Sequence, residues 1–321
     1  MHLSPPDFRN PPFAHPETSS MPSISLPSQL RVRARALALA ATSLLPFVMG
    51  SSLANAAGTR QLATGGATQF EGAAGGGLVP WAAITGYGSR EEIGANAFIT
   101  HVDTGDYKLD SRGVSVGLYN RVELSFARQE LDLVALGPAL SLPGATLDQD
   151  VFGAKVRIAG DVLYTRMPQI AAGIQYKRQR DFAIPSAVGA RDDSGIDVYV
   201  SATKVFLAGA GGYNLFTNLT LRSTNANETG LLGFGGDLGS DRNLLLEGSV
   251  GVLANRYWAV GTEYKSKRGQ LSALPEDDWW DVFVAWFPNR HVSVVLAYAN
   301  LGTVATLPHQ DGWYLSITGG F

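Results

Sequence analysis

The stretch WDVFVAWFPNRHVSVVLAY, residues 280–298, decides the fold class. Before its single proline, apolar side chains stand at every second position: Trp280, Val282, Val284 and Trp286. After the short connection Pro288–His291 the alternation resumes, at Val292, Val294, Leu296 and Tyr298. A period of two puts successive side chains on opposite faces of an extended chain, so the stretch predicts two antiparallel strands joined by a tight turn.

The same alternation recurs along the chain from residue 114 onward, and eleven segments show it clearly. Weaker alternation at Leu62–Phe70, Trp81–Tyr87 and Ile93–Val102 adds three candidates, so we expect about fourteen strands, with twelve as the alternative. The segment Gly58–Gly77 either forms the first strand or plugs the lumen of a barrel with twelve or thirteen strands.

Short connections, such as Asn120-Arg121 and Asn255-Arg256, take turns with long ones, such as Asp103–Arg112 and Ser223–Arg242. This arrangement is typical of bacterial outer-membrane barrels, which have short periplasmic turns and long extracellular loops. The less apolar face of the strands is mostly Gly, Ala, Ser and Thr with few charges, whereas a soluble β-sandwich would carry a charged outer face. The sequence therefore predicts an all-β protein, an antiparallel transmembrane β-barrel of the outer-membrane type.

The first 56 residues are expected to precede the barrel, which spans residues 57–321. Residues 1–29 are rich in proline and predict a disordered leader or a mis-annotated start, with Met21 as the true beginning. Residues 30–56 combine three arginines, the apolar run Ala36–Met49 and the sequence Ala54-Asn55-Ala56, which together predict a signal peptide cleaved after Ala56. We expect the exported chain to reside in the cell outer membrane.

Aromatic residues gather where the predicted strands meet their connections, and this predicts two girdles at the membrane boundaries. Representative girdle positions are Tyr119, Trp258, Trp280, Trp286 and Trp313. The final residue, Phe321, ends an alternating strand and is predicted to be a signal read by the barrel assembly machinery. The expected partners are this machinery and the outer-membrane lipids, including lipopolysaccharide.

Ten charged residues fall on the strand face opposite the apolar one, and we expect all of them to line the lumen because charges facing lipid are costly. They are Glu123, Lys155, Arg157, Lys177, Asp197, Arg222, Glu247, Glu263, Lys265 and Asp281. Five are acidic and five are basic, so they either border an aqueous path or pair with one another and seal the barrel. The first reading predicts a narrow passive channel for small or amphipathic solutes of unknown identity; the second predicts a structural or surface-interaction barrel.

No catalytic constellation stands out, and we expect no enzyme activity, cofactor or metal. The chain has no cysteine, which excludes thiol chemistry and disulfides, and its formal net charge of −3 gives no electrostatic support for a nucleic-acid partner. A further alternative is an outer-membrane lipid hydrolase, in which His101 would act with Ser111 or Asp103.

Five motifs also resemble an uncharacterised family of proteobacterial outer-membrane proteins, known as a domain of unknown function. They are EGAAGGGLVPW from Glu71, IGANAF from Ile93, DDSGIDVYVSATK from Asp192, LLGFGGD from Leu231 and DVFVAWFPNRHVS from Asp281. The resemblance runs from about Leu62 to Phe321. It implies the fold and the location but no mechanism, because the family carries no assigned activity.

Overall fold

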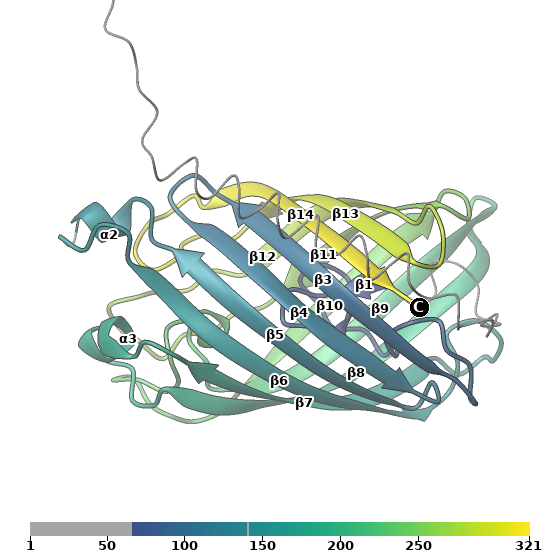
Figure 1. Cartoon of the computed structure of the whole chain (residues 1–321), viewed down its shortest axis with the longest axis horizontal. Helices are drawn as coiled ribbons and strands as arrows, with labels where there is room; N and C mark the ends of the chain where they lie inside the picture. The colour runs from purple at the N-terminus through teal and green to yellow at the C-terminus, as the bar shows by residue number, and fades with distance from the viewer. Residues whose placement is uncertain (1–65, 140) are drawn as a thin grey trace, which may run out of the picture. The chain divides into compact units, whose positions relative to one another are not determined.

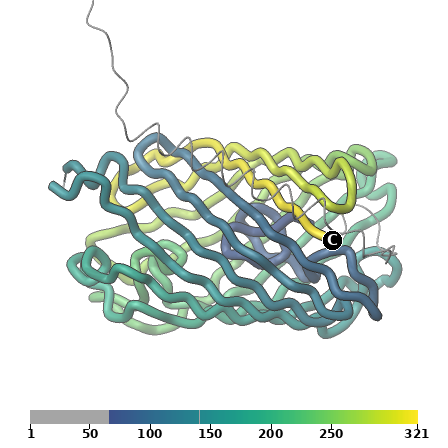
Figure 2. Tube along the Cα trace, in the orientation of Figure 1, coloured from purple at the N-terminus to yellow at the C-terminus, as the bar shows by residue number. Residues whose placement is uncertain are grey.

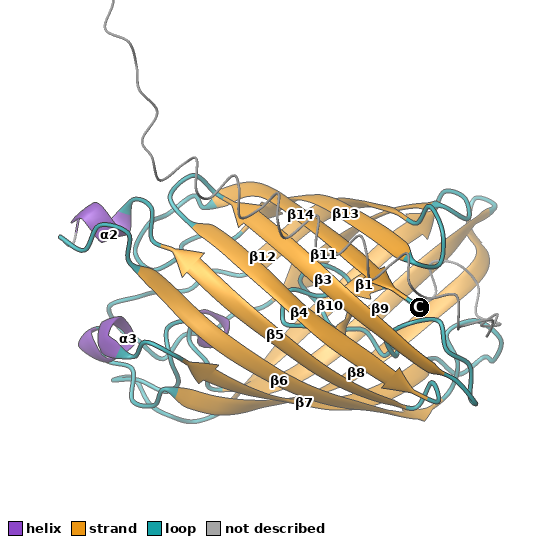
Figure 3. Cartoon of the chain, viewed as in Figure 1, coloured by secondary structure: helices purple, strands orange, loops and turns teal. Residues whose placement is uncertain are grey.

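The computed structural model describes residues 66–139 and 141–321, and within them twelve antiparallel strands, β3–β14, form a closed barrel (Figures 1 and 3). The strands are β3 Ile93–Asp103, β4 Lys108–Leu118, β5 Val122–Asp132, β6 Thr146–Ala159, β7 Gln169–Gln179, β8 Ser194–Ala210, β9 Tyr213–Thr224, β10 Asn243–Leu253, β11 Trp258–Lys265, β12 Trp279–Trp286, β13 Val292–Asn300 and β14 Asp311–Gly320. The last strand closes on the first, with partners running from Trp313 opposite Asp103 to Gly320 opposite Asn96. The predicted leader and signal peptide lie outside the described residues.

The fold class is confirmed with the alternative count of twelve strands, and the estimate of fourteen is wrong. The segment Trp81–Tyr87 and the described part of Leu62–Phe70 do not join the barrel but lie inside it. Here β1 (Ala67–Thr68) pairs only with β2 (Ala74–Gly75). The side chains of this segment are buried on every side, whereas a barrel strand exposes every second side chain to lipid. The weak alternation before residue 88 therefore reflects small residues packed within the lumen.

The outer surface of the barrel carries the apolar side chains that the alternation predicts. Val282 and Leu296 are about half exposed, while their neighbours Phe283 and Ala297 are buried inside. Charged side chains on this surface lie nearer the loops, as do Arg128 and Asp150, which pair at 2.7 Å. The wall thus presents an apolar belt to its surroundings, as a barrel in a bilayer requires.

The two ends of the barrel differ. We call the end with β-turns such as Asn120-Arg121 the turn end, and the opposite end the loop end. The loop end carries the short helices α2 (Leu136–Ala139), α3 (Ala183–Ala187) and η1 (Glu228–Gly230), of which the first two are prominent in Figure 3. None of the helices in the described part of the chain is long and apolar enough to cross a membrane. One predicted long connection, Asp103–Arg112, is a tight turn of four residues at the loop end, because β3 and β4 continue pairing to Asp103 and Lys108.

The loops fold over the barrel and pack against one another. Their buried apolar residues, together with Leu131 of β5 and Leu147 of β6, form one cluster at the loop end: Tyr107, Leu131, Leu133, Leu147, Ala190, Leu231, Leu232, Leu271, Leu274, Val304 and Ala305. Apolar packing of this kind removes the loops from water and holds them across the lumen. The loop end is consequently covered rather than open.

Candidate functional site: a plugged lumen

The segment of residues 66–85, which we call the plug, fills the middle of the barrel (Figure 2). It appears there as the purple trace enclosed by the strands. Its backbone approaches the wall closely at the run Gly75-Gly76-Gly77. A Cβ atom at Gly76 would lie 2.0 Å from Oε1 of Glu263, so a side chain at this position would displace the carboxylate of Glu263 on β11. The segment Gly58–Gly77 therefore forms a plug in its described part, the second of the two expectations.

A buried charge cluster attaches the plug to the barrel wall. It consists of Glu71, Lys177, Asp197, Arg222, Glu247 and Lys265, three acidic and three basic groups. Glu71 comes from the plug and forms an ion pair with Lys177; it lies 3.4 Å from Arg222 and 3.9 Å from Lys265. On the wall, Arg222 pairs with Glu247 at 2.6 Å and with Asp197 at 3.1 Å. Equal numbers of opposite charges compensate one another, as buried charges must.

The plug carboxylate of Glu71 stays ionised in this setting. Burial alone would raise its pKa, but the positive charges of Lys177, Lys265 and Arg222 outweigh burial and hold the pKa below its usual range. Glu71 is thus a fixed negative charge that the lumen wall surrounds with cations.

Two further wall carboxylates hold the backbone of the plug. Glu263 accepts hydrogen bonds from the N–H groups of Gly77 and Leu78, each at 2.7 Å. Glu123 accepts from the N–H groups of Ala74 at 3.1 Å and Thr85 at 2.8 Å. These bonds satisfy backbone donors that could not reach water inside the barrel.

Donors from the wall satisfy the plug carbonyl groups in the same way. The ammonium group of Lys155 donates to the carbonyl oxygens of Ala74 at 3.0 Å and Trp81 at 3.1 Å. The carbonyl of Pro80 accepts from the hydroxyl of Thr220 at 2.8 Å. The plug therefore bonds to the wall along its length.

All ten charged residues predicted for the lumen face inward and are buried. Eight of them belong to the charge cluster or bond directly to the plug. The other two are Arg157, which pairs with Asp161 at 3.1 Å near the turn end, and Asp281, which accepts a 3.1 Å hydrogen bond from the backbone N–H of Glu263. The set does not border a continuous aqueous path in this structure, because the plug occupies the space between its members. Glu71 is the residue that the sequence did not single out, although it begins the glycine-rich motif EGAAGGGLVPW.

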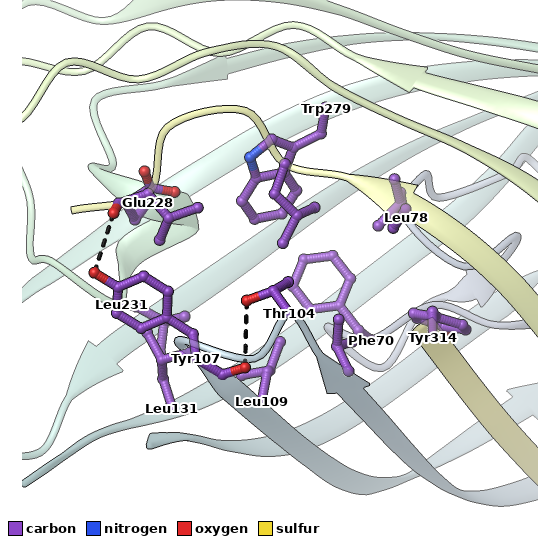
Figure 4. A pocket seen from close by; sticks show the side chains of 14 residues that line it. Phe70, Leu78, Thr104, Tyr107, Leu109, Leu131, Glu228, Leu231, Trp279 and Tyr314 are labelled. Atoms are coloured by element: carbon purple, nitrogen blue, oxygen red, sulfur yellow. Dashed lines mark hydrogen bonds between the residues drawn. The ribbon is translucent and has the colours of Figure 1, made fainter. Parts of the chain in front are cut away.

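The wall formed by β12–β14 is mostly apolar on its inner face, although it also carries Asp281, Ser293, Ser316 and Thr318, and it contrasts with the charged wall of β5–β11. Its inward side chains include Phe283, Ala285, Val295, Ala297, Ala299 and Tyr314. Two cavities lie along this wall, one on each side of the plug. The loop-side cavity, shown in Figure 4, has about 50 Å³ of space and is lined by Phe70, Leu78, Tyr107, Leu231, Trp279 and Tyr314 among others.

The turn-side cavity is smaller, with about 30 Å³ of space. Wall residues Phe216 and Phe283 line it, and the plug contributes Gly75, Gly76 and Gly77. The boundary between the two cavities is therefore the plug backbone at two consecutive residues, because Gly77 lines the turn-side cavity and Leu78 lines the loop-side one.

The other predicted residues lie at the barrel rims. Trp258 and Trp286 stack near the turn end with ring centroids 5.8 Å apart, while Trp280 and Trp313 lie nearer the loops. Tyr119 is exposed at the turn end. The remaining rim residue, Phe321, follows β14 and exchanges two 3.0 Å backbone hydrogen bonds with Ala95 of β3.

The residues suggested for a lipid hydrolase do not assemble. His101 points outward and contacts Asp110 at 2.7 Å, whereas Ser111 is buried inside and donates a 2.6 Å hydrogen bond to the carbonyl of Phe70. Asp103 pairs with Lys108 at 3.0 Å. Within the described residues, no group of three or more His, Asp or Glu side chains is placed to hold a metal ion.

The family model named Protein of unknown function (DUF3034) matches residues 64–318, which include the plug and nearly the whole barrel. The chain belongs to this family. No curated protein is similar enough to count as a match. The barrel of this DUF3034 protein is an outer-membrane β-barrel, as its closed ladder and apolar belt show.

Several solved outer-membrane barrels are similar to the chain. The KdgM porin is 10% identical, with 71% of this chain and 99% of the porin covered and a TM-score of 0.45. The NanC porin is 10% identical over 70% of this chain and 98% of that porin, with a TM-score of 0.43. The COG4313 outer membrane channel from Pseudomonas putida F1 is 12% identical over 76% of this chain and 97% of the channel, with a TM-score of 0.42.

Proposed function

We propose that this DUF3034 protein is a gated passive channel that lets small apolar or amphipathic molecules cross the outer membrane along the β12–β14 wall. The observation that carries the proposal is the pair of apolar cavities on one wall, separated by the plug backbone at Gly77-Leu78. An apolar solute gains free energy from leaving water for such a surface, whereas a hydrated ion does not. The plug is the gate.

The two walls have different roles in this mechanism. The charge cluster anchors the plug through Glu71 on the β7–β11 side, and breaking it exposes buried charge, so this part of the plug stays in place. The β12–β14 wall contacts the plug through apolar packing, as between Phe70 and Trp279, whose ring centroids lie 6.3 Å apart. Apolar packing is non-directional and tolerates displacement better than a hydrogen-bonded network does. A solute therefore passes when the plug turns about the Glu71 anchor and Gly75–Leu78 moves off the wall, which breaks the hydrogen bonds of Gly77 and Leu78 to Glu263 without expelling the whole plug.

The second candidate is a barrel whose lumen never opens, with a structural or surface-interaction role. The buried ion pairs and the carboxylate–backbone bonds of the plug favour this candidate, because each of them would resist movement. The two candidates differ in one measurable property, which is whether passage depends on the freedom of the plug.

A disulfide between plug and wall tests this directly, because the chain has no native cysteine. A Cβ atom at Gly72 would lie 3.3 Å from Cβ of Ala127 on β5, close to the separation of about 3.5–4.5 Å found in disulfides. We expect the double variant Gly72→Cys/Ala127→Cys to show slower entry of apolar solutes into liposomes when oxidised, and recovery after reduction. The single Gly72→Cys variant is the control, because Gly72 has φ of +97° and a side chain there strains the backbone with or without a disulfide.

The proposal is wrong if wild-type protein in liposomes passes no solute under any condition, and the closed barrel then takes its place. Passage that is equal in the oxidised and reduced double variant would show a path that does not depend on the plug. That result would also overturn the gate.

A further inference from the structure

Three buried polar atoms of residues that line the loop-side cavity have no hydrogen-bond partner among the described residues. They are Nε1 of Trp279, a donor, Oε1 of Glu228, an acceptor, and the hydroxyl of Tyr314, which can be either. The side chains of Trp279 and Glu228 are only 6% and 3% exposed. Buried polar atoms are nearly always paired, so the unpaired donor of Trp279 and the unpaired acceptor of Glu228 on the same cavity need an explanation.

The two atoms lie at the same end of the cavity. The ammonium group of Lys267 contacts both residues, at 2.7 Å from Oε2 of Glu228 and 4.0 Å from the centre of the Trp279 ring. In Figure 4 the indole nitrogen of Trp279 is on the side of its ring that faces Glu228. A donor and an acceptor thus stand close together at one end of the cavity.

Two other hydroxyl groups of the cavity already have partners, whereas the hydroxyl of Tyr314 does not. The hydroxyl of Tyr107 donates to the carbonyl of Val304 at 3.1 Å, and the hydroxyl of Thr104 donates to Oε1 of Gln310 at 2.8 Å. The remaining lining is apolar, with the rings of Phe70 and Trp279 on one side and leucine and valine side chains around them. Apart from the hydroxyl of Tyr314, the cavity therefore offers one polar position, between Trp279 and Glu228, within an apolar surface.

We propose that the loop-side cavity binds a small hydroxylated aromatic molecule of the phenol class. A hydroxyl group donates one hydrogen bond and accepts another, so it satisfies Oε1 of Glu228 and Nε1 of Trp279 together. An ammonium group could donate to Glu228 but could not accept from Trp279, and a carboxylate would be repelled by Glu228 and the neighbouring Glu276. The ring of a phenol packs against Phe70 and Trp279, since aromatic rings prefer offset or edge contacts at such distances.

The cavity has space for a compact ligand at most. Its volume of about 50 Å³ exceeds the roughly 10–15 Å³ that a single water needs, whereas an engineered apolar cavity that binds benzene has roughly 150 Å³, so a phenol ring enters only when the lining side chains move apart. This inference deepens the proposed function. It rests on that function in one respect only, which is that the molecule bound in the cavity is taken to be the solute that passes through the channel.

The test compares phenol with benzene, which has the same ring and no hydroxyl, by isothermal titration calorimetry on the full barrel in detergent. We expect phenol to bind about tenfold or more tightly, because a site with buried polar groups discriminates against a ligand that leaves them unpaired. Trp279→Phe keeps a ring but removes the donor, and Glu228→Leu removes the acceptor while Glu276 continues to pair with Lys267 at 3.0 Å. Each change should reduce the preference for phenol to less than threefold and leave benzene binding unchanged. Trp313→Phe, on the outer surface, should have no effect.

Equal binding of phenol and benzene by the wild type would overturn the inference, and so would a preference that survives in Trp279→Phe. Failure of the gated channel gives a different pattern, because binding in detergent does not require the plug to move. Tight phenol binding without entry into liposomes would reject the channel and keep the site. Entry of apolar solutes into liposomes, without a preference for phenol in the binding measurement, would keep the channel and reject the site.

Discussion

The carboxylate of Glu263 on β11 and the backbone N–H of Leu78 in the plug are joined by a hydrogen bond of 2.7 Å. The same carboxylate accepts from Gly77, and its other oxygen accepts from the hydroxyl of Ser249 at 2.6 Å. One wall side chain therefore fixes the two plug residues that separate the cavities. In the proposed gate, Glu263 is the residue that holds the plug in its closed position.

Glu263→Gln should loosen the plug at this point. Glutamine keeps one acceptor oxygen but loses the charge, and hydrogen bonds to charged groups contribute about 1.5–3 kcal/mol. We expect the amides of Gly77 and Leu78 to exchange hydrogen about tenfold or more faster, and solute entry into liposomes to rise. Glu91→Gln, an exposed position before β3, is the matched control. Unchanged exchange at both amides would show that Glu263 does not hold the plug.

Glu71→Gln should destabilise the whole barrel. It leaves three cations facing two carboxylates in the buried charge cluster, and removing one partner of a buried ion pair costs about 3–5 kcal/mol. The unheated protein should then lose its fast-migrating folded form in SDS at a lower temperature than the wild type. Lys265→Met in the same chain should recover part of the loss, because it restores the charge balance and Lys265 Nζ makes no hydrogen bond among the described residues. If the double variant Glu71→Gln/Lys265→Met is less stable than Glu71→Gln alone, the charge cluster does not stabilise the barrel through its balance of charge.

The loop end should become less stable as pH rises through neutrality. Burial raises the pKa of Glu228 to about 7; Lys267 opposes this shift, while Glu276 and Asp277 add to it. Because its pKa in the unfolded chain is lower, near 4.5, the folded protein binds a proton more tightly. The contribution of Glu228 to stability is fully present below about pH 4.5 and is lost as the pH rises through about 7.

The measurement is limited proteolysis of the loops between pH 5.5 and 8.5, with rates corrected for the activity of the protease on an unfolded substrate. Cleavage within residues 225–242 should accelerate toward high pH. In Glu228→Gln, which cannot ionise, the dependence should be largely removed. A dependence as steep as that of the wild type would assign the effect to another group. That group would not be Tyr107, which also faces Glu228, because burial and the charges of Glu228 and Asp106 raise the pKa of Tyr107 to about 12, far above this pH range.

Phe321 offers a test of the predicted assembly signal. Deleting the residue removes its side chain and the two backbone hydrogen bonds to Ala95, whereas Phe321→Ala removes the side chain alone. If the assembly machinery reads the aromatic side chain, both variants should reach the outer membrane in reduced amounts. If only the deletion fails, the residue acts by closing the ladder between β14 and β3. The readout is the amount of heat-modifiable protein in the outer-membrane fraction.

The sequence by itself determined the barrel. Every strand from β4 to β14 repeats apolar and small or polar residues with a period of two, because one face meets lipid and the other the lumen. The same rule placed the ten charged residues inside, since a charge facing lipid costs about 2–4 kcal/mol near the bilayer midplane. Each strand must alternate lipid-facing and lumen-facing residues by itself, so the sequence of each strand is sufficient to reveal this alternation.

The tertiary structure alone decided what fills the barrel. The plug shows only a weak alternation that does not correspond to barrel strands, because its side chains are buried on all sides, and Glu71 gave no signal beyond a glycine-rich motif. Its role arises from Lys177, Arg222 and Lys265, which lie about 100 to 200 residues away in the chain and meet it only when the barrel closes. Likewise, equal numbers of acidic and basic residues in the lumen are compatible with an open aqueous path or with mutual pairing. Only the distances of these residues to one another and to the plug distinguish the two arrangements. Long-range pairing in the lumen depends on the register of all twelve strands, and no single segment of sequence carries that information.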